Sequence, residues 1–126
     1  MNNTSPLSTK RYYRDLVVWQ GAIDLVTEIY RRTALFPDHE RFGLVSQLRR
    51  AAVSVPSNIA EGQGRLTKGE FRQFLGQARG SLMEIETQLI IARNLGYLRE
   101  PEAKTLFERT SEVGRMLNGL VQSIRS

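Results

Sequence analysis

The stretch from Leu44 to Gly62 constrains the fold most, because it combines a helical apolar pattern with an internal proline. Apolar residues recur there at spacings of three and four, so they form one stripe of an α-helix: Val45, Leu48, Ala52, Val55 and Ile59. Pro56 lies inside the stripe, removes a backbone donor and frees the carbonyl near Ala52. We therefore expect a helix that bends at Pro56.

Two helices are predicted in the first half of the chain. The first runs from about Asp15 to Thr33 and carries the apolar stripe Leu16, Trp19, Ile23, Val26 and Tyr30. The loop around Pro37 ends it, and Asp38 is a suitable N-cap for a second helix over about 39–63. Glycines at positions 62 and 64 end this second helix and form a tight connection.

Two more helices are predicted in the second half. Thr67 and Glu70 have capping-box spacing, and Gly96 is placed to cap a helix that ends near Asn94. Its apolar stripe has the most regular periodicity in the chain: Phe71, Leu75, Ala78, Leu82, Ile85, Leu89 and Ala92. Pro101 opens the last helix, whose stripe is Leu106, Val113, Leu117, Leu120 and Ile124.

These four amphipathic segments predict an all-α fold, an antiparallel up-down four-helix bundle. No segment shows the alternation of a β-strand. Residues 1–13 are polar and without periodicity, so we expect a flexible N-terminal tail followed by one bundle domain over residues 14–126.

Residue content argues against catalysis and metal binding. The chain of 126 residues has no cysteine, which excludes disulfides, thiolate metal sites and a cysteine nucleophile. His39 is the only histidine, lies at a predicted helix start and is expected to be exposed, too isolated for a zinc site. Ser54 and Ser57 have no histidine base nearby in the sequence. We expect no enzyme activity, no cofactor and no metal.

The sequence also indicates where the protein resides. It contains no apolar run of the roughly 18 residues that a bilayer span requires, and its N-terminus lacks a secretory signal pattern. We expect a cytoplasmic protein without a membrane partner.

Glycines inside the predicted helices need a reason, because each costs about 1 kcal/mol relative to alanine. Gly76 and Gly80 lie one turn apart in the third helix, and Gly114 and Gly119 lie in the fourth. Close approach of another helix, from the same bundle or from a neighbouring subunit, accounts for such positions. We favour a subunit contact for some of them.

Charge suggests an anionic partner. The formal net charge is +5, and only Lys10, Lys68 and Lys104 among the 18 basic residues are lysines. Arginine forks match phosphate geometry, so RNA or DNA is a plausible partner. An arginine-rich genome combined with ordinary solvated helix faces gives the same composition.

A linear basic patch is predicted on the third helix. Arg72, Arg79 and Arg93 are separated by multiples of seven, so they share one side of the helix, with Glu86 interrupting them. The candidate nucleic-acid-binding residues are Arg65, Lys68, Arg72, Arg79 and Arg93. The alternative is a solvated edge of the bundle or a subunit seam paired with glutamates.

Charged residues beside the core stripes have a structural interpretation. Glu84 and Glu86 point about 200° apart on a helix, so they cannot converge on one substrate. We expect interhelical or intersubunit ion pairing by five residues near these stripes: Arg49, Arg50, Glu61, Glu84 and Glu86.

One long motif and several shorter segments together carry a family resemblance: the run from Gln47 to Gly62, Phe71, Phe74, Leu75, Ala78, the run from Gly80 to Leu89, and the segments 16–19 and 95–98. Through these residues the chain resembles the bacterial four-helix bundle proteins of the 23S rRNA intervening-sequence type. The structural motif residues are Arg49, Arg50, Pro56, Asn58, Glu61, Gly80, Glu84 and Glu86. The family is similar to the accessory protein of diversity-generating retroelements, which works beside a reverse transcriptase and its RNA.

The resemblance implies a homopentamer without enzymatic activity and a mainly structural role for the shared motif. Our leading interpretation is a ring-forming helical bundle that contacts RNA or DNA through its arginine-rich surface. The alternative is a protein-interaction scaffold that binds no nucleic acid. The candidate partners are further copies of the chain, RNA or DNA, and a reverse transcriptase or another protein.

Overall fold

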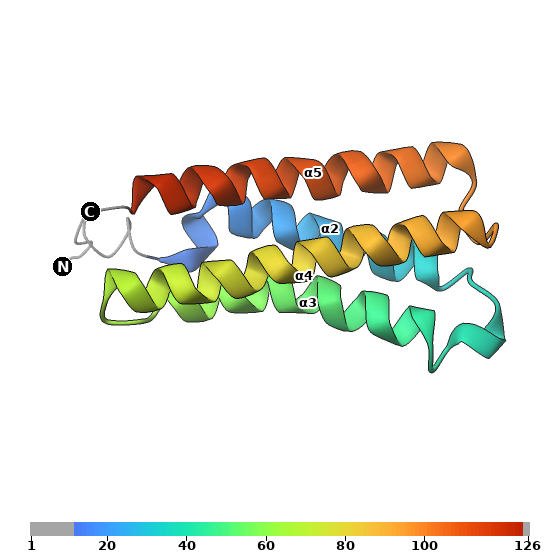
Figure 1. The fold of residues 1–126 in the computed structure, drawn as a ribbon, viewed down its shortest axis with the longest axis horizontal. Helices are drawn as coiled ribbons and strands as arrows, with labels where there is room; N and C mark the ends of the chain where they lie inside the picture. Colours follow the sequence, from blue (N-terminus) through green and yellow to red (C-terminus); the bar gives the residue numbers. More distant parts are fainter. Residues whose placement is uncertain (1–11, 125–126) are drawn as a thin grey trace.

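The protein is described by a computed structural model that covers residues 12–124. Four long helices and two short 3-10 turns follow one another along the chain: η1 (Tyr13–Asp15), α2 (Val17–Thr33), η2 (Asp38–Glu40), α3 (Leu44–Gln63), α4 (Lys68–Asn94) and α5 (Glu100–Ser123). The long helices run alternately in opposite directions along one axis (Figure 1). Residues 12–124 form no β-strand.

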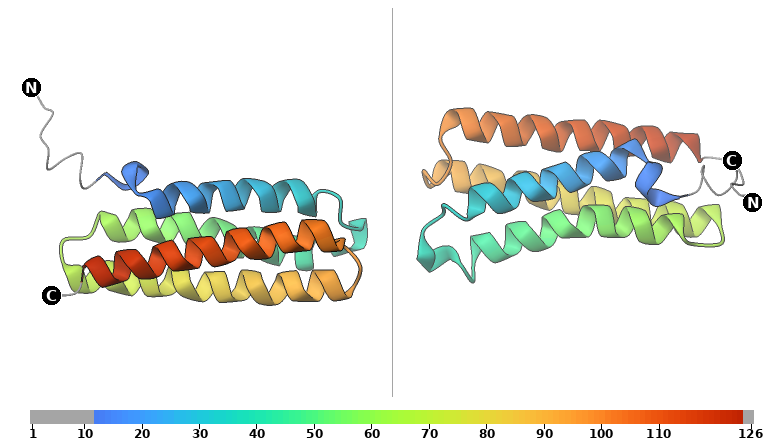
Figure 2. Two further views of the ribbon diagram at one scale, coloured as in Figure 1. Left: turned by 90° about the horizontal axis from the view of Figure 1, so that it is seen from above. Right: turned by 180° about the vertical axis from the view of Figure 1, so that it is seen from behind.

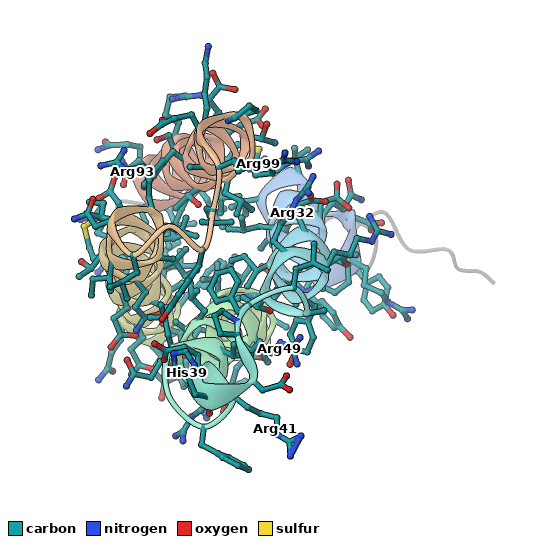
Figure 3. All side chains as sticks on the ribbon, turned by 90° about the vertical axis from the view of Figure 1, so that its right-hand side faces the viewer. Arg32, His39, Arg41, Arg49, Arg93 and Arg99 are labelled. Carbon is teal, nitrogen blue, oxygen red and sulfur yellow. The ribbon has the colours of Figure 1, made fainter. Side chains whose placement is uncertain are left out.

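The helices enclose a single core in an up-down-up-down arrangement. Viewed from one end, α2 lies diagonally opposite α4, and α3 lies diagonally opposite α5 (Figure 3). Each helix therefore packs against its neighbours in the chain, and α5 returns beside α2 (Figure 2). The predicted four-helix bundle is confirmed. The expected tail falls largely on residues 1–11, which lie outside the described part of the chain, and Tyr13 begins η1.

The buried face of α2 differs from the predicted stripe. Val18, Ala22, Leu25 and Ile29 are buried, whereas Ile23 and Tyr30 of the predicted stripe are 36% and 41% exposed. Helix α2 carries two adjacent apolar stripes, so the periodicity of the sequence does not tell which of them faces the core. The small residue Ala22 and its neighbour Gly21 select the observed face. A Cβ at Gly21 would lie 2.6 Å from Cε of Met116, so the Met116 side chain of α5 occupies the space beside Gly21.

The start of α3 also differs from the prediction. Asp38 begins the 3-10 turn η2 and does not cap the long helix, which starts at Leu44. The chain leaves helical geometry at Gly43, with φ −109° and ψ −108°. Glu40 supplies a partner for one of the unpaired backbone N–H groups in the first turn of α3, because its Oε1 accepts a hydrogen bond of 3.1 Å from the N–H of Leu44.

The apolar stripe of α3 is buried as predicted, and the helix continues through Pro56, which is itself buried. On the side towards α4, small residues bring the two helices together. The Ser54 and Ser81 hydroxyl oxygens are 2.7 Å apart in a hydrogen bond between α3 and α4. Asn58 Nδ2 donates to the Ser54 carbonyl at 2.8 Å and to its hydroxyl at 2.9 Å. Both serine hydroxyls and the amide nitrogen of Asn58 therefore find partners.

Gly62 marks the closest approach of α3 to α4. A Cβ at this position would lie 2.8 Å from Cβ of Phe74 and 3.3 Å from the carbonyl oxygen of Phe71. By contrast, a Cβ at Gly76, Gly80, Gly114 or Gly119 would meet no atom of the described chain within 4 Å. Contact with another helix of the same bundle therefore does not explain those four glycines.

The predicted ends of α4 are confirmed. The Thr67 hydroxyl accepts from the backbone N–H of Glu70 at 3.1 Å, as the capping-box spacing predicts. Gly96 takes φ +81°, and the N–H of Tyr97 then reaches the Ala92 carbonyl at 2.9 Å. Pro101 lies in the first turn of α5. No helix built by residues 12–124 combines the length and apolar character that crossing a membrane requires.

Alanine substitutions at two glycines test the α3–α4 packing. We expect Gly62→Ala to lower the free energy of unfolding by about 1–3 kcal/mol, because the added methyl overlaps Phe74 and the backbone of Phe71. The control Gly119→Ala adds its methyl in open space and should raise stability by up to about 1 kcal/mol. Urea unfolding at one fixed protein concentration gives both values. A Gly62→Ala protein as stable as the parent would contradict the proposed close packing.

Candidate functional site

Three arginines of the predicted basic patch lie where α4 meets α5, a region that we call the α4–α5 seam (Arg72, Arg79 and Arg93). Arg72 Nη1 donates to the carbonyl of Ile124 at 3.2 Å, and Arg79 Nη2 donates to Asn118 Oδ1. Arg93 places its guanidinium 5.3 Å from the ring centre of Phe107, and Figure 3 shows it between α4 and α5. All three arginines thus bridge the two helices.

The partners of the seam arginines are neutral. The described residues form four ion pairs, each between residues three or four positions apart, and none includes a seam arginine. Glu86 stands on the same side of α4 between Arg79 and Arg93 but pairs with neither. A carbonyl, an amide oxygen and an aromatic face orient the guanidinium groups without neutralising them. The three seam arginines therefore span about 32 Å of helix, the rise over the 21 residues from Arg72 to Arg93, and the Glu86 carboxylate lies between Arg79 and Arg93.

The other two patch candidates have different surroundings. Arg65 lies in the α3–α4 turn, where its Nη2 is 3.2 Å from Glu61 Oε2 and its guanidinium lies 4.6 Å from the ring centre of Phe74. Its charge is thus compensated locally. Lys68 is the first residue of α4 and is exposed. The five candidates are consequently three seam arginines, one exposed lysine and one ion-paired arginine.

The motif arginines of α3 do not form the predicted ion pairs within the described chain. Arg49 Nε donates to Thr33 Oγ1 at 2.9 Å, and its Nη2 donates to the Tyr30 carbonyl at 3.2 Å. It therefore ties α3 to the last turn of α2 by neutral bonds, and Figure 3 shows it between the two helices. Arg50 is exposed and forms no ion pair within residues 12–124.

The motif glutamates of α4 lie on different sides of that helix, as their spacing predicts. Glu84 lines a polar groove beside α3 that also contains Gln47, Arg50 and Gln88. Glu86 lines a groove of about 280 Å³ between α4 and α5, together with seam residue Arg79. The motif glycine Gly80 is exposed between them. The two carboxylates therefore do not share a site.

A polar cluster that the sequence patterns did not predict lies at the end of the bundle formed by the η2 turn and the α4–α5 loop. Tyr97 donates its hydroxyl proton to Glu40 Oε2 at 2.9 Å, and His39 Nε2 lies 3.3 Å from the same hydroxyl. The hydrogen bond from the Leu44 N–H, followed by that from Tyr97, lowers the pKa of Glu40 below its ordinary value. The same bond to Glu40 raises the pKa of Tyr97. Glu40 and Tyr97 are 57 positions apart in the sequence, so no local sequence pattern predicts their contact.

A second carboxylate with a shifted pKa, Glu102 of α5, lies at this end of the bundle. Burial acts to raise the pKa of Glu102, but hydrogen bonding and the charges of Arg99 and Arg32 outweigh it and lower that pKa. Arg99 Nη2 is 3.2 Å from Glu102 Oε2. Figure 3 shows both arginines at this end of the molecule. The two perturbed carboxylates thus have packing partners and do not converge on a cleft.

Within residues 12–124, no three His, Cys, Asp or Glu side chains gather closely enough to hold a metal ion. His39 is exposed, as predicted. The arrangement offers charged and aromatic surfaces for binding.

Comparisons with known proteins support the fold and a family. The sequence profile described as 23S rRNA-intervening sequence protein matches residues 14–119. A search of curated proteins gives no match. A crystal structure from Bacteroides thetaiotaomicron VPI-5482, titled as a protein with unknown function from the S23 ribosomal protein family, superposes with a TM-score of 0.75. It is 18% identical, and the alignment covers 83% of this chain and 98% of that one.

Substituting Glu40 tests the polar cluster through pH. Because folding lowers its pKa, Glu40 contributes stability above the ordinary value of 4.5, and this contribution is lost as the pH falls through the lowered value. We expect Glu40→Gln to lower the Tm at about pH 7 by a few degrees and to differ little from the parent near about pH 3. Glu108→Gln, which removes an exposed carboxylate of α5, serves as the control. An equal Tm difference at both pH values would refute the charge-dependent role.

Proposed function

The chain belongs to the 23S rRNA-intervening sequence protein family, and on that premise we propose that it is a non-enzymatic, self-associating helical bundle that binds the phosphate backbone of RNA or DNA. The observation that carries this proposal is that the three arginines of the α4–α5 seam form no ion pair within residues 12–124. Three arginines share one side of α4, and each is held by a neutral partner. Such groups attract phosphates without first breaking an ion pair.

The seam suits backbone binding without sequence readout. Arg79 is exposed, while Arg72 and Arg93 are half-buried, so all three side chains keep part of their surface accessible to a ligand. A guanidinium fixed by one neutral bond loses less freedom when it binds a phosphate. Neutralising phosphates releases counterions, which makes the affinity strongly dependent on salt.

Self-association is proposed through the exposed side of α4, which we call the α4 outer stripe (Gly76, Gly80, Met83, Thr87 and Ile90). These residues recur at spacings of four and three, and none is charged. Met83 is 56% exposed and Ile90 is 39% exposed. The two glycines leave room for another helix backbone, since no atom lies within 4 Å of their Cβ positions.

The proposed assembly is the homopentamer that the resemblance implies. A ring is built from heterologous contacts, so the α4 outer stripe supplies one half of each contact. A pentameric ring places several α4–α5 seams near one nucleic-acid strand, and simultaneous contacts with these seams raise the overall affinity. A reverse transcriptase or another protein acting on the same nucleic acid is the proposed further partner.

A protein-interaction scaffold is the second candidate function. It is favoured by the interhelical contacts of Arg72 and Arg79, which give these arginines a structural role without any ligand. In this case the positive charge serves solubility and the exposed apolar residues bind protein. The two functions differ in whether the isolated protein retains RNA or DNA.

Two triple variants with equal loss of charge test phosphate binding. Arg72→Gln, Arg79→Gln and Arg93→Gln together should weaken RNA and DNA binding at least about tenfold at low salt and lower the salt slope by about 2–3. The control, Arg31→Gln with Arg32→Gln and Arg99→Gln, removes arginines that are ion-paired with Glu28 or Glu102. Filter binding across a salt series measures both.

The control variant should retain most of the affinity, because each of its arginines lies beside a carboxylate that offsets part of its attraction for phosphate. If the two triple variants lose affinity equally, net charge alone governs binding and the seam has no special role. If the parent protein retains no oligonucleotide at about 50 mM salt, the nucleic-acid function is wrong and the scaffold remains.

Assembly is tested on the α4 outer stripe. Light scattering coupled to size exclusion should give five chains for the parent. Met83→Glu with Ile90→Glu should dissociate the assembly, because charges would be buried in the contact. Leu66→Glu, at a residue that is 98% exposed in the α3–α4 turn, is the matched control. A parent monomer at micromolar concentration, or a pentamer unaffected by the double change, would overturn the proposed contact.

A further inference from the structure

A groove between α2 and α3, here called the α2–α3 groove, combines positive charge with aromatic surface. Its volume is about 630 Å³, within the usual range for small-ligand sites. Its lining residues are Tyr30, Arg41, Phe42, Val45, Ser46, Arg49, Arg50, Val53 and Ser54. Three of them are arginines and none is acidic, so the groove complements an anion that also carries a flat apolar group.

One wall of the α2–α3 groove is rigid. The Arg49 guanidinium lies 4.4 Å from the ring centre of Tyr30 and is fixed by hydrogen bonds to Thr33 Oγ1 and the Tyr30 carbonyl. These bonds use Nε and Nη2, which leaves the N–H groups of Nη1 for a ligand. The wall therefore offers an oriented donor before any ligand binds.

The other wall projects into solvent. Phe42 is 88% exposed, and the guanidinium of Arg41 lies 5.2 Å from its ring centre. Figure 3 shows Arg41 extending outwards from the bundle. Arg50, one turn into α3, is exposed and has no ion pair within residues 12–124. Stacking of another flat ring on Phe42 would remove its apolar face from water, which is favourable, and the nearby arginines would attract an anion attached to that ring.

We propose that the α2–α3 groove binds an unpaired base and its adjoining phosphate in single-stranded RNA or DNA. The base stacks on Phe42, and the phosphate accepts hydrogen bonds from Arg50 and from Nη1 of Arg49. A duplex keeps its bases stacked on one another, so it cannot present one to this groove. This inference rests on the proposed function and adds a preference for single strands, which the α4–α5 seam does not give.

Charge on the opposite side of α3 limits the path of the strand. Arg50 also lines the polar groove towards α4, where Glu84 contributes a carboxylate. Phosphate is repelled by that carboxylate, whereas the α2 side of Arg50 has only arginine and neutral neighbours. The strand is therefore expected to lie on the α2 side of α3.

The test compares a single-stranded RNA of about 12 nucleotides with its duplex. Phe42→Ala and Arg50→Gln, separately, should each weaken single-strand binding by about five- to a hundredfold and change duplex binding by less than about twofold. Leu35→Ala removes a side chain that is 78% exposed outside the groove and is the control for Phe42. Arg31→Gln is the control for Arg50, and fluorescence anisotropy gives the affinities.

Three results would overturn the groove proposal. One is unchanged single-strand affinity in the Phe42→Ala protein, and another is an equal loss for single strand and duplex. A third is dissociation of the assembly in light scattering, which would make the groove a subunit contact. If the seam triple variant still weakens both probes, phosphate binding by the seam stands while the groove proposal falls. If the parent protein binds neither probe, both proposals are wrong.

Discussion

The close packing of α3 against α4 is the contact on which the rest of the bundle depends. Gly62 lets the end of α3 meet Phe71 and Phe74, and the hydrogen bond between Ser54 and Ser81 joins the helices near their middle. This closeness is possible only because small side chains face each other. It fixes the rotation of α4, and the rotation of α4 decides which of its residues face α5 and which face solvent.

The remaining faces of α4 carry the proposed functions. One side places Arg72, Arg79 and Arg93 against α5, where neutral partners hold them. The side farthest from the core presents the α4 outer stripe, which is free of charge. The α2–α3 groove lies across the bundle from this stripe, whereas the α4–α5 seam adjoins it, since Met83 and Arg79 line one groove.

Much of the fold was predictable because the patterns that specify it are local. The capping box at Thr67, the αL glycine at Gly96 and the stripe of α4 each act within a few residues, and each is confirmed. The rotation of α2 was not predictable, because two adjacent apolar stripes are present on the helix and the pattern does not say which one faces the core. The seam partners of Arg72 and Arg79 are 52 and 39 positions away, so the sequence could place these arginines on one face without revealing what holds them.

The central claim is that the seam arginines, whose partners within the chain are uncharged, bind phosphate. Arginine footprinting tests this claim most directly. The protein is labelled with phenylglyoxal with and without a bound RNA oligonucleotide, and the modified peptides are quantified by mass spectrometry. The account predicts protection of Arg72, Arg79 and Arg93, with unchanged labelling of Arg31 and Arg32, which pair with Glu28. Protection spread evenly over all arginines, or absent from the three seam residues while RNA is bound, would contradict it.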